Sequence, residues 1–102
     1  FYAQAMAEDG TDFVNRPVPQ GDLPTSRSMI FVSPDGERSM NTYLGISSEL
    51  GPDDVPEAVA GSAAILFLEG YLYDKPAGKA AFETAARLTR RAGGRAGIAL
   101  SD

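Results

Sequence analysis

The residues best placed to do chemistry lie at Glu69–Asp74, directly after an apolar run that ends at Leu68. In open parallel sheets, ligands bind outside the carboxyl ends of the strands, so a site is expected where this run ends. Gly70 allows a close approach of the backbone, and Tyr71 offers a flat face with a polar tip. Asp74 suits the cap of a following helix, which is the simpler interpretation of that residue. Tyr71 is therefore the candidate ligand contact in this segment, with a purely structural role as an equal alternative.

Arginines form the second group of residues that could do chemistry. Arg38 could hold an anionic or hydroxylated ligand, or could lie over a neighbouring strand with its charged head in water. Four further arginines suggest a phosphate site: Arg87, Arg90, Arg91 and Arg95. Three of the four fall in the last turns of a predicted helix, where cations offset the negative end of the helix dipole. The dipole explains this cluster better than a phosphate site does.

Composition excludes several classes of function. The 102 residues include nine basic and fourteen acidic side chains, and the net charge of −5 disfavours nucleic-acid binding. Because Cys and His are both absent, disulfides, the usual zinc sites and Ser-His or Cys-His nucleophiles are excluded. The sequence has no Walker-type or Gly-x-Gly-x-x-Gly phosphate loop, and no apolar run approaches the roughly 20 residues that span a bilayer. We therefore expect a cytoplasmic protein of one domain, without a metal site, a nucleic-acid partner or a membrane partner.

A β-hairpin is predicted at Ser26–Ser47, where two strand-like runs flank Pro34-Asp35-Gly36. This is a strong turn signal, because Pro presets a negative φ and Gly accepts a positive one. Side chains alternate along a strand. One face therefore carries Met40, Thr42 and Leu44, and in the first run Ile30 and Val32 share a face while Met29 and Phe31 share the other. A strand with both faces occupied is either buried between layers or covers something.

A βαβ unit is predicted from Ala63 onward. The apolar run Ala63–Leu68 suits a parallel strand buried on both faces. A helix follows, capped by Asp74 with Pro76 in its first turn, and Gly93-Gly94 ends it. Ala96–Leu100 is expected to be the second strand. The helix has an apolar stripe at spacings of three and four, which consists of Ala81, Ala85, Leu88 and Ala92, widened by Phe82.

The remaining segments connect these units. Tyr2–Glu8 is predicted to be the end of a helix. Thr11–Thr25 is rich in Pro and is expected to be an irregular connection, with a short strand at Phe13-Val14. Asp54 precedes Glu57 by three residues, the spacing of a capping box, which predicts a short helix over Val55–Ala60.

The hairpin sequence resembles a known family. The stretch SPDGERSMNTYLG at Ser33–Gly45 is similar to the "pDGeRtm.t.lGa" stretch of PfkB-type (ribokinase-like) carbohydrate kinases, above all the members grouped with adenosine kinases. Three further segments follow in the family's order: Pro24-Thr25, Leu68–Leu72 and Leu100–Asp102. The resemblance implies that residues 1–102 are the middle portion of one kinase domain. Residues 1–61 would supply the end of a helix, the lid hairpin strands and a short helix, and residues 62–102 the βαβ piece of the core.

The resemblance also implies a fold and an activity. Family members are three-layer α/β/α sandwiches with a β-sheet lid, so the chain would be a partial three-layer α/β/α ribokinase-like fold with a β-hairpin lid element. They are phosphotransferases that use ATP and Mg²⁺ to phosphorylate an alcohol group of a sugar or nucleoside, and some form homodimers through the lid. The second hairpin strand lines the substrate pocket in such kinases. A substrate-binding role is thereby carried over to Arg38, Met40, Thr42, Leu44 and Tyr71.

The family's catalytic parts are not in this sequence. It lacks the amino-terminal Gly-Gly substrate motif, the Asn-x-x-Glu segment linked to magnesium and phosphate, and the Gly-Ala-Gly-Asp segment that supplies the catalytic base and the anion hole. We therefore expect no catalytic residue and no metal ligand in this segment, which alone should bind neither ATP nor Mg²⁺. Two alternatives stay open. One is a binding or assembly module that pairs through the hairpin edge, and the other is a degenerate relative that keeps the pocket without the chemistry.

Overall fold

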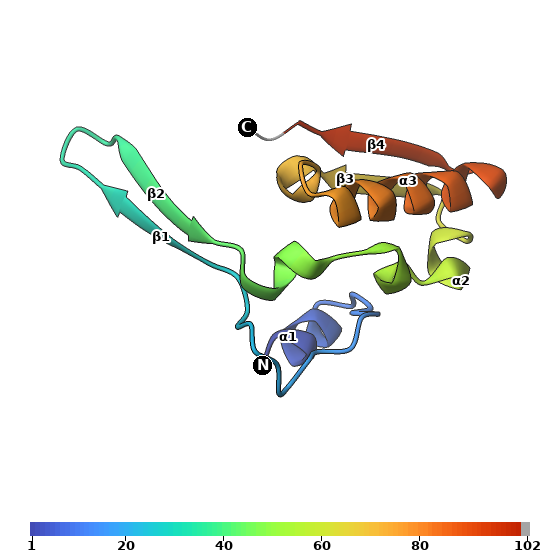
Figure 1. The fold of residues 1–102 in the computed structure, drawn as a ribbon, viewed down its shortest axis with the longest axis horizontal. Helices are drawn as coiled ribbons and strands as arrows, with labels where there is room; N and C mark the ends of the chain where they lie inside the picture. The colour runs from blue at the N-terminus through green and yellow to red at the C-terminus, as the bar shows by residue number, and fades with distance from the viewer. Residues whose placement is uncertain (101–102) are drawn as a thin grey trace.

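The computed structural model describes residues 1–100. In chain order its elements are α1 (Tyr2–Glu8), β1 (Arg27–Val32), β2 (Arg38–Tyr43), α2 (Glu57–Ala60), β3 (Ile65–Glu69), α3 (Pro76–Arg91) and β4 (Arg95–Ala99). β1 pairs with β2 in antiparallel orientation, and β3 pairs with β4 in parallel. Figure 1 shows the β1–β2 hairpin projecting from a body that the later elements form. The predicted α/β class with a β-hairpin is confirmed.

The hairpin forms as predicted because its turn residues meet the backbone requirements of a three-residue loop. Gly36 adopts a φ of 85°, in the left-handed region that favours glycine. The amide of Ser33 donates to the carbonyl of Glu37 at 3.0 Å, and the amide of Gly36 donates to the carbonyl of Ser33 at 2.9 Å. These two hydrogen bonds close the turn and fix which residues of β1 and β2 face each other.

The Asp35 side chain reinforces this turn. Its carboxylate accepts hydrogen bonds from the hydroxyl of Ser33 and, at 3.3 Å, from the amide of Glu37. These hydrogen bonds, above all the one from Ser33, hold the pKa of the Asp35 carboxyl below its ordinary value, because they stabilise the charged form. The stabilisation they give the turn is present above the ordinary pKa and is lost as the pH falls through the lowered pKa.

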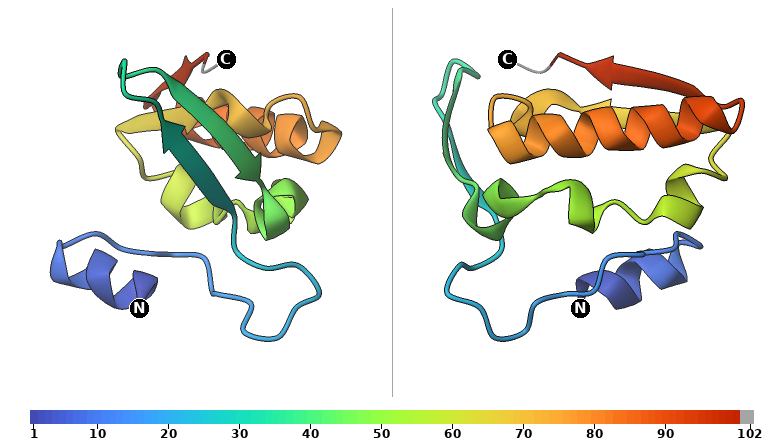
Figure 2. Two further views of the ribbon diagram at one scale, coloured as in Figure 1. Left: turned by 90° about the vertical axis from the view of Figure 1, so that its left-hand side faces the viewer. Right: turned by 45° about the vertical axis from the view of Figure 1, so that its right-hand side comes forward.

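α3 is the centre of the body. It lies between the β3–β4 pair and the segment that runs from Gly45 to α2 (Figures 1 and 2). On the sheet face toward α3, Leu66 lies opposite Ala96 and Leu68 lies opposite Ile98. The buried residues of α3 follow one side of the helix and are Gly78, Ala81, Phe82, Ala85 and Thr89. The predicted strand–helix–strand unit is therefore confirmed.

Thr89 ties two helices together. Its side chain is 0 % exposed, and its hydroxyl donates a 2.8 Å hydrogen bond to the carbonyl of Ala60 at the end of α2. The apolar stripe predicted from the sequence does not include Thr89, because a search for apolar residues leaves out a residue that carries a hydroxyl group. It does contain Ala92, which is exposed.

The capping box predicted at Asp54 is wrong. α2 begins after Pro56 and has no side-chain cap at its N-terminus. Asp54 instead closes a short 3₁₀ helix, where its carboxylate accepts a 2.9 Å hydrogen bond from the amide of Gly51. The carboxylate therefore satisfies a local amide, but one that lies before the predicted helix rather than inside it.

The cap predicted at Asp74 is also wrong. α3 begins after Lys75, without a side-chain cap. Pro76 occupies the first turn as predicted, where its fixed φ suits a helix and its missing amide hydrogen costs nothing. The proline therefore marks the start of α3 better than the nearby carboxylate does.

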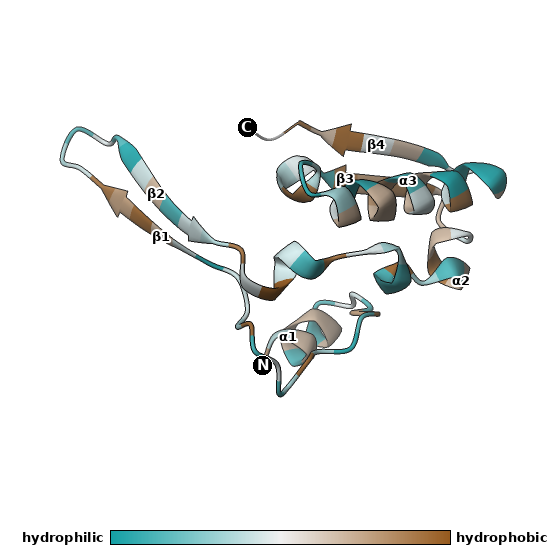
Figure 3. Cartoon of the chain, viewed as in Figure 1, coloured by the Kyte–Doolittle hydropathy of each residue, from teal (hydrophilic) through white to brown (hydrophobic). Residues whose placement is uncertain are grey.

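The expectation that β3 is buried on both faces is wrong for the described residues. Ile65 and Phe67 point away from α3 and are 75 % and 65 % exposed. The hairpin is exposed on both faces as well, and Figure 3 shows how apolar β1 is. A continuous apolar run predicts cover on both sides of a strand, whereas α3 covers only one side of the parallel pair.

α1 and the connection that follows it lie beside the segment after the hairpin. The rings of Tyr2 and Phe13 meet edge to face, with centroids 5.3 Å apart. The side-chain amide of Asn15 donates a 2.7 Å hydrogen bond to the carbonyl of Asp54. The connection is irregular, as predicted, but Phe13-Val14 forms no strand, which corrects that part of the prediction.

Replacing Thr89 by Val should lower the free energy of unfolding by about 1–3 kcal/mol, because it leaves the carbonyl of Ala60 without its hydrogen bond in a buried position. Urea denaturation measures the change. Thr89→Ser is the matched control, since it keeps the hydroxyl and removes one methyl group. If Thr89→Val were no more destabilising than Thr89→Ser, the hydrogen bond would not be what joins α2 to α3.

Replacing Ser33 by Ala should raise the pKa of the Asp35 carboxyl toward its ordinary value, because the strongest of the hydrogen bonds to the carboxylate is removed. Nuclear magnetic resonance of the carboxyl carbon during an acid titration measures this pKa. Ser39→Ala, on β2 beyond the turn, should leave it unchanged. An unchanged Asp35 titration in Ser33→Ala would show that the hydroxyl does not stabilise the turn.

Candidate functional site

A hollow of about 670 Å³ lies between the hairpin and the chain segment that follows β3. We call it the hairpin cleft. Figure 2 shows the hairpin standing beside the end of the body where β3 finishes. The cleft is lined by Ser26, Arg27, Ser28, Ile30, Met40, Thr42, Leu44, Ser47, Glu69, Tyr71 and Leu72. It therefore lies at the carboxyl end of a parallel strand, where ligands bind in open α/β sheets.

Four of the five residues assigned to substrate binding line this cleft. Met40, Thr42 and Leu44 come from the hairpin side, and Tyr71 comes from the opposite side. Arg38 does not line it. Arg38 shares a face with Met40 and Thr42, but it pairs with Val32 at the end of the hairpin next to the turn. The structure thus brings together four predicted residues and leaves Arg38 toward the tip.

The hairpin wall of the cleft changes in polarity along the strands. Ile30 lies opposite Met40, which makes an apolar pair. Two residues closer to the body, Ser28 lies opposite Thr42, and their hydroxyl oxygens are 2.8 Å apart. The wall therefore offers an apolar patch beside a pair of hydroxyls.

The opposite wall is formed by Glu69, Tyr71 and Leu72. Glu69 is the last residue of β3, and a short 3₁₀ helix at Gly70–Leu72 follows directly and presents Tyr71 and Leu72. The start of α3 supports it, because a Cβ atom added to Gly78 would lie 2.2 Å from the carbonyl oxygen of Leu72. Only glycine permits that contact, so Gly78 lets α3 hold this wall in place. Tyr71 itself is 64 % exposed, which leaves its ring open to the cleft.

Gly45 fixes the base of the hairpin wall. It is buried, has a φ of 54°, and would place a Cβ atom 2.1 Å from the carbonyl oxygen of Pro24. That carbonyl accepts a 2.9 Å hydrogen bond from the amide of Ile46. The chain entering the hairpin and the chain leaving it are therefore held together at the body.

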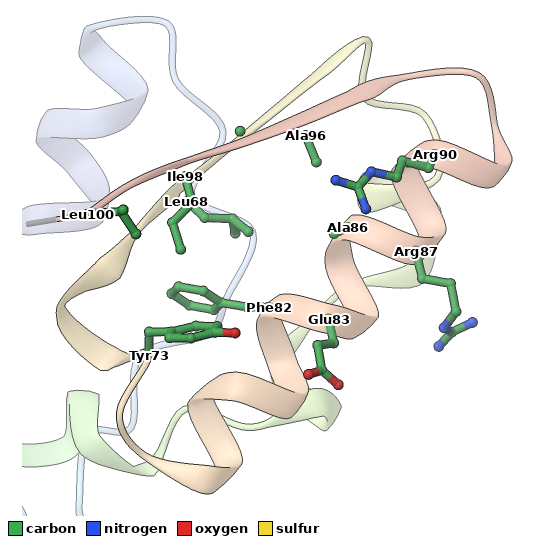
Figure 4. A pocket seen from close by; sticks show the side chains of 11 residues that line it. Leu68, Tyr73, Phe82, Glu83, Ala86, Arg87, Arg90, Ala96, Ile98 and Leu100 are labelled. Carbon is green, nitrogen blue, oxygen red and sulfur yellow. The ribbon is translucent and has the colours of Figure 1, made fainter.

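A second hollow, of about 450 Å³, lies beside α3. Figure 4 shows the rings of Phe82 and Tyr73 next to each other below Leu68 and Ile98. Their centroids are 5.9 Å apart. Of the arginine cluster, Arg87 and Arg90 line this groove and the other two members do not. No residue assigned to substrate binding lies here, so the groove is separate from the hairpin cleft.

Sequence reasoning missed part of the cleft. Ser28 and Ile30 face it from β1 but carry no predicted role. The turn at Gly36 could have revealed them, because a three-residue loop fixes the register and places both opposite the predicted residues of β2. Ser101 and Asp102, which belong to the family-like segment Leu100–Asp102, are outside the described residues.

Residues 1–100 contain no group of three or more acidic side chains arranged to hold a metal ion. Within the same range, none of the helices combines the length and the apolar character needed to cross a membrane. The cleft side chains are thus hydroxyls, a carboxylate, a phenol, an arginine and apolar groups. Such a surface can enclose a small hydroxylated molecule with an apolar part.

Comparisons with known proteins gave matches among solved structures. An adenosine kinase from Sinorhizobium meliloti is 44 % identical over 99 % of this chain, with a TM-score of 0.88. A probable sugar kinase from Rhizobium etli CFN 42 is 43 % identical over 99 % of the chain, with a TM-score of 0.85. The chain spans only 31 % and 30 % of these two structures. No protein-family model and no curated protein sequence matches the chain.

Replacing Gly45 by Ala should destabilise the protein and displace the hairpin. The added methyl group collides with the carbonyl of Pro24, and the left-handed backbone conformation alone costs an L-residue roughly 1–2 kcal/mol. Urea denaturation measures the loss, and hydrogen exchange of the Ile46 amide reports on the base of the hairpin. Gly51→Ala is the matched control, since its added Cβ would meet only an ordinary 3.8 Å contact. Equal effects of the two changes would contradict the role of Gly45.

Proposed function

The predicted resemblance to PfkB-type carbohydrate kinases is confirmed, and from this relationship we propose that the chain is the substrate-covering and core segment of an ATP-dependent sugar or nucleoside kinase. Such a kinase transfers the γ-phosphate of ATP to an alcohol group of its acceptor. In this proposal the hairpin is the lid of the acceptor pocket, and the β3–α3–β4 unit is part of the core that supports it.

One observation carries the proposal. Four of the residues that the resemblance assigns to substrate binding line one hollow at the carboxyl end of β3. Two of them, Met40 and Tyr71, are 31 positions apart in the sequence. The resemblance to the family rests on sequence motifs, whereas the hollow is a property of the fold. The agreement of these two independent lines supports an acceptor pocket at the hairpin cleft.

The role of this chain is to enclose the acceptor rather than to carry out the transfer. Ile30 and Met40 shield one side of the cleft with apolar surface, and Tyr71 and Leu72 shield the other. Excluding water from a kinase site favours transfer to the acceptor over hydrolysis of ATP. The described residues hold no acidic cluster for a metal ion and no glycine-rich phosphate loop. In this proposal, ATP and Mg²⁺ are bound by other parts of the kinase, as the resemblance implies.

The acceptor is a sugar or a nucleoside. One matching protein is named as an adenosine kinase and the other as a probable sugar kinase, so both classes are candidates. The apolar part of the cleft, with Met40 and Leu44, suits a flat base somewhat better than a bare sugar. The opposite face of the hairpin carries Met29 and Phe31, which are also exposed and do not line the cleft.

Identity at 43–44 % over nearly the whole chain favours this proposal over a free-standing module that pairs through the hairpin edge. The two roles also use different groups. A lid uses the side chains on the face of the hairpin, whereas edge pairing uses the backbone of its outer strands. Substitutions on the two faces of the hairpin therefore distinguish a lid from an edge-pairing module.

Met40→Arg in the full-length protein should raise the KM for the acceptor about tenfold or more and change the KM for ATP by much less. The change puts a charge where the cleft is apolar, and loss of about 1.4 kcal/mol of binding corresponds to a factor of ten. Steady-state kinetics measures both constants, with adenosine or ribose varied at saturating ATP and with ATP varied at a saturating acceptor concentration.

Met29→Arg is the matched control, because Met29 lies on the opposite face of the hairpin and is 57 % exposed, close to the 61 % of Met40. It should leave the acceptor KM nearly unchanged. The proposal fails if both variants change the acceptor KM alike, or if Met40→Arg weakens both substrates to the same extent.

A further inference from the structure

The hydroxyl groups of Ser28 and Thr42 form a pair on the hairpin wall, and the residues assigned by resemblance include only one of the two. Ser28 on β1 and Thr42 on β2 are register partners, and their oxygens are 2.8 Å apart. Both residues are exposed and both line the hairpin cleft. Thr42 is among the residues assigned by resemblance, whereas Ser28 comes from the other strand and has no assigned role.

The hydrogen-bonding capacity of this pair exceeds what the pair itself uses. Each hydroxyl has one hydrogen to donate and two lone pairs that accept. One hydrogen bond joins the two oxygens, so one hydrogen and three lone pairs are left to face the cleft. The hydroxyl of an alcohol can donate one hydrogen bond and accept others at the same oxygen, so it can bond to both members of the pair.

The position of the pair sets where along the wall a hydroxyl of a bound molecule can lie. Along the same face, the apolar pair Ile30–Met40 lies two residues nearer the tip, a distance of about 7 Å along a strand. Glu69 and Tyr71 face the hairpin from the other wall. On the other side of the pair, Leu44 also lines the cleft. A bound molecule would therefore place a hydroxyl at Ser28 and Thr42, between its apolar contacts with Met40 and Leu44.

We propose that Ser28 is a specificity-determining residue that acts together with Thr42 to bind a hydroxyl of the acceptor. This inference rests on the proposed kinase function. The hydroxyl in question is one that does not react, because neutral serine and threonine side chains cannot take the proton that the reacting alcohol must lose. The pair thus selects acceptors that carry a second hydroxyl at the correct distance from the part that contacts Met40.

A purely structural role makes a different prediction. Cross-strand hydroxyl pairs stabilise antiparallel strands modestly, and loss of such a contact would loosen the hairpin for every acceptor alike. Loss of recognition would affect only those acceptors that carry the recognised hydroxyl. Comparing an acceptor with its deoxy analogues therefore separates the two roles.

The experiment measures kcat and KM of the full-length protein with two sets of acceptors: adenosine with 2′-deoxyadenosine and 3′-deoxyadenosine, and ribose with 2-deoxyribose. The wild-type protein should prefer the parent acceptor to at least one deoxy analogue. In Ser28→Ala and in Thr42→Val, this preference in kcat/KM should fall by roughly three- to tenfold, the worth of one hydrogen bond. The loss should appear mainly in the KM for the acceptor.

Conservative variants provide the control. Ser28→Thr and Thr42→Ser keep the hydroxyls and should keep most of the preference. Equal losses for parent and deoxy acceptors, or an unchanged preference in Ser28→Ala, would overturn the role of Ser28 while leaving the kinase function intact. If the wild-type protein phosphorylates none of the five acceptors, the proposed function itself fails and the inference fails with it.

Discussion

The contact between Gly45 and the carbonyl of Pro24 decides where the hairpin stands. At this point the chain enters and leaves the hairpin side by side, and a Cβ atom would come within 2.1 Å of the carbonyl oxygen. The amide of Ile46 can reach the same carbonyl at 2.9 Å only because no side chain intervenes. At the opposite wall, Gly78 at the start of α3 lets the carbonyl of Leu72 approach the helix backbone, because a Cβ atom there would lie 2.2 Å from the carbonyl oxygen. Both walls of the cleft are thus set by close approaches of the backbone that glycine allows.

The apolar surface of the chain is distributed in a way that fits a cover. Buried apolar residues are few and small apart from Phe82, and they gather around α3. Large apolar residues are exposed on both faces of the hairpin and on the free face of β3. Contiguous exposed apolar surface marks sites where a protein binds something else. These faces are therefore available for contact with a ligand or with another protein surface.

Sequence patterns predicted the elements better than the details of their ends. The hairpin and α3 followed from strong local signals, namely the turn at Gly36 and the periodic small residues of the helix. The helix caps at Asp54 and Asp74 did not, because a carboxylate can satisfy whichever amide lies nearest, and Asp54 bonds to Gly51. Thr89 was missed because its burial depends on a partner 29 residues away, which no local pattern contains. Arg38 was assigned to substrate binding by the family resemblance, which gives the place of a residue in a motif but not its distance from the opposite wall of the cleft.

The turn at the tip of the hairpin sets the register of the two strands, and the register determines which side chains face the cleft. Side chains alternate with a period of two, so a slip of one residue would turn every side chain of β2 to the other face. Asn41 and Tyr43 would then face the cleft in place of Met40 and Thr42. The three-residue loop closed at Gly36, with the Asp35 carboxylate across it, excludes that slip. Residues that never touch the cleft therefore determine which groups line it, and the family-like stretch Ser33–Gly45 includes the turn as well as the strand.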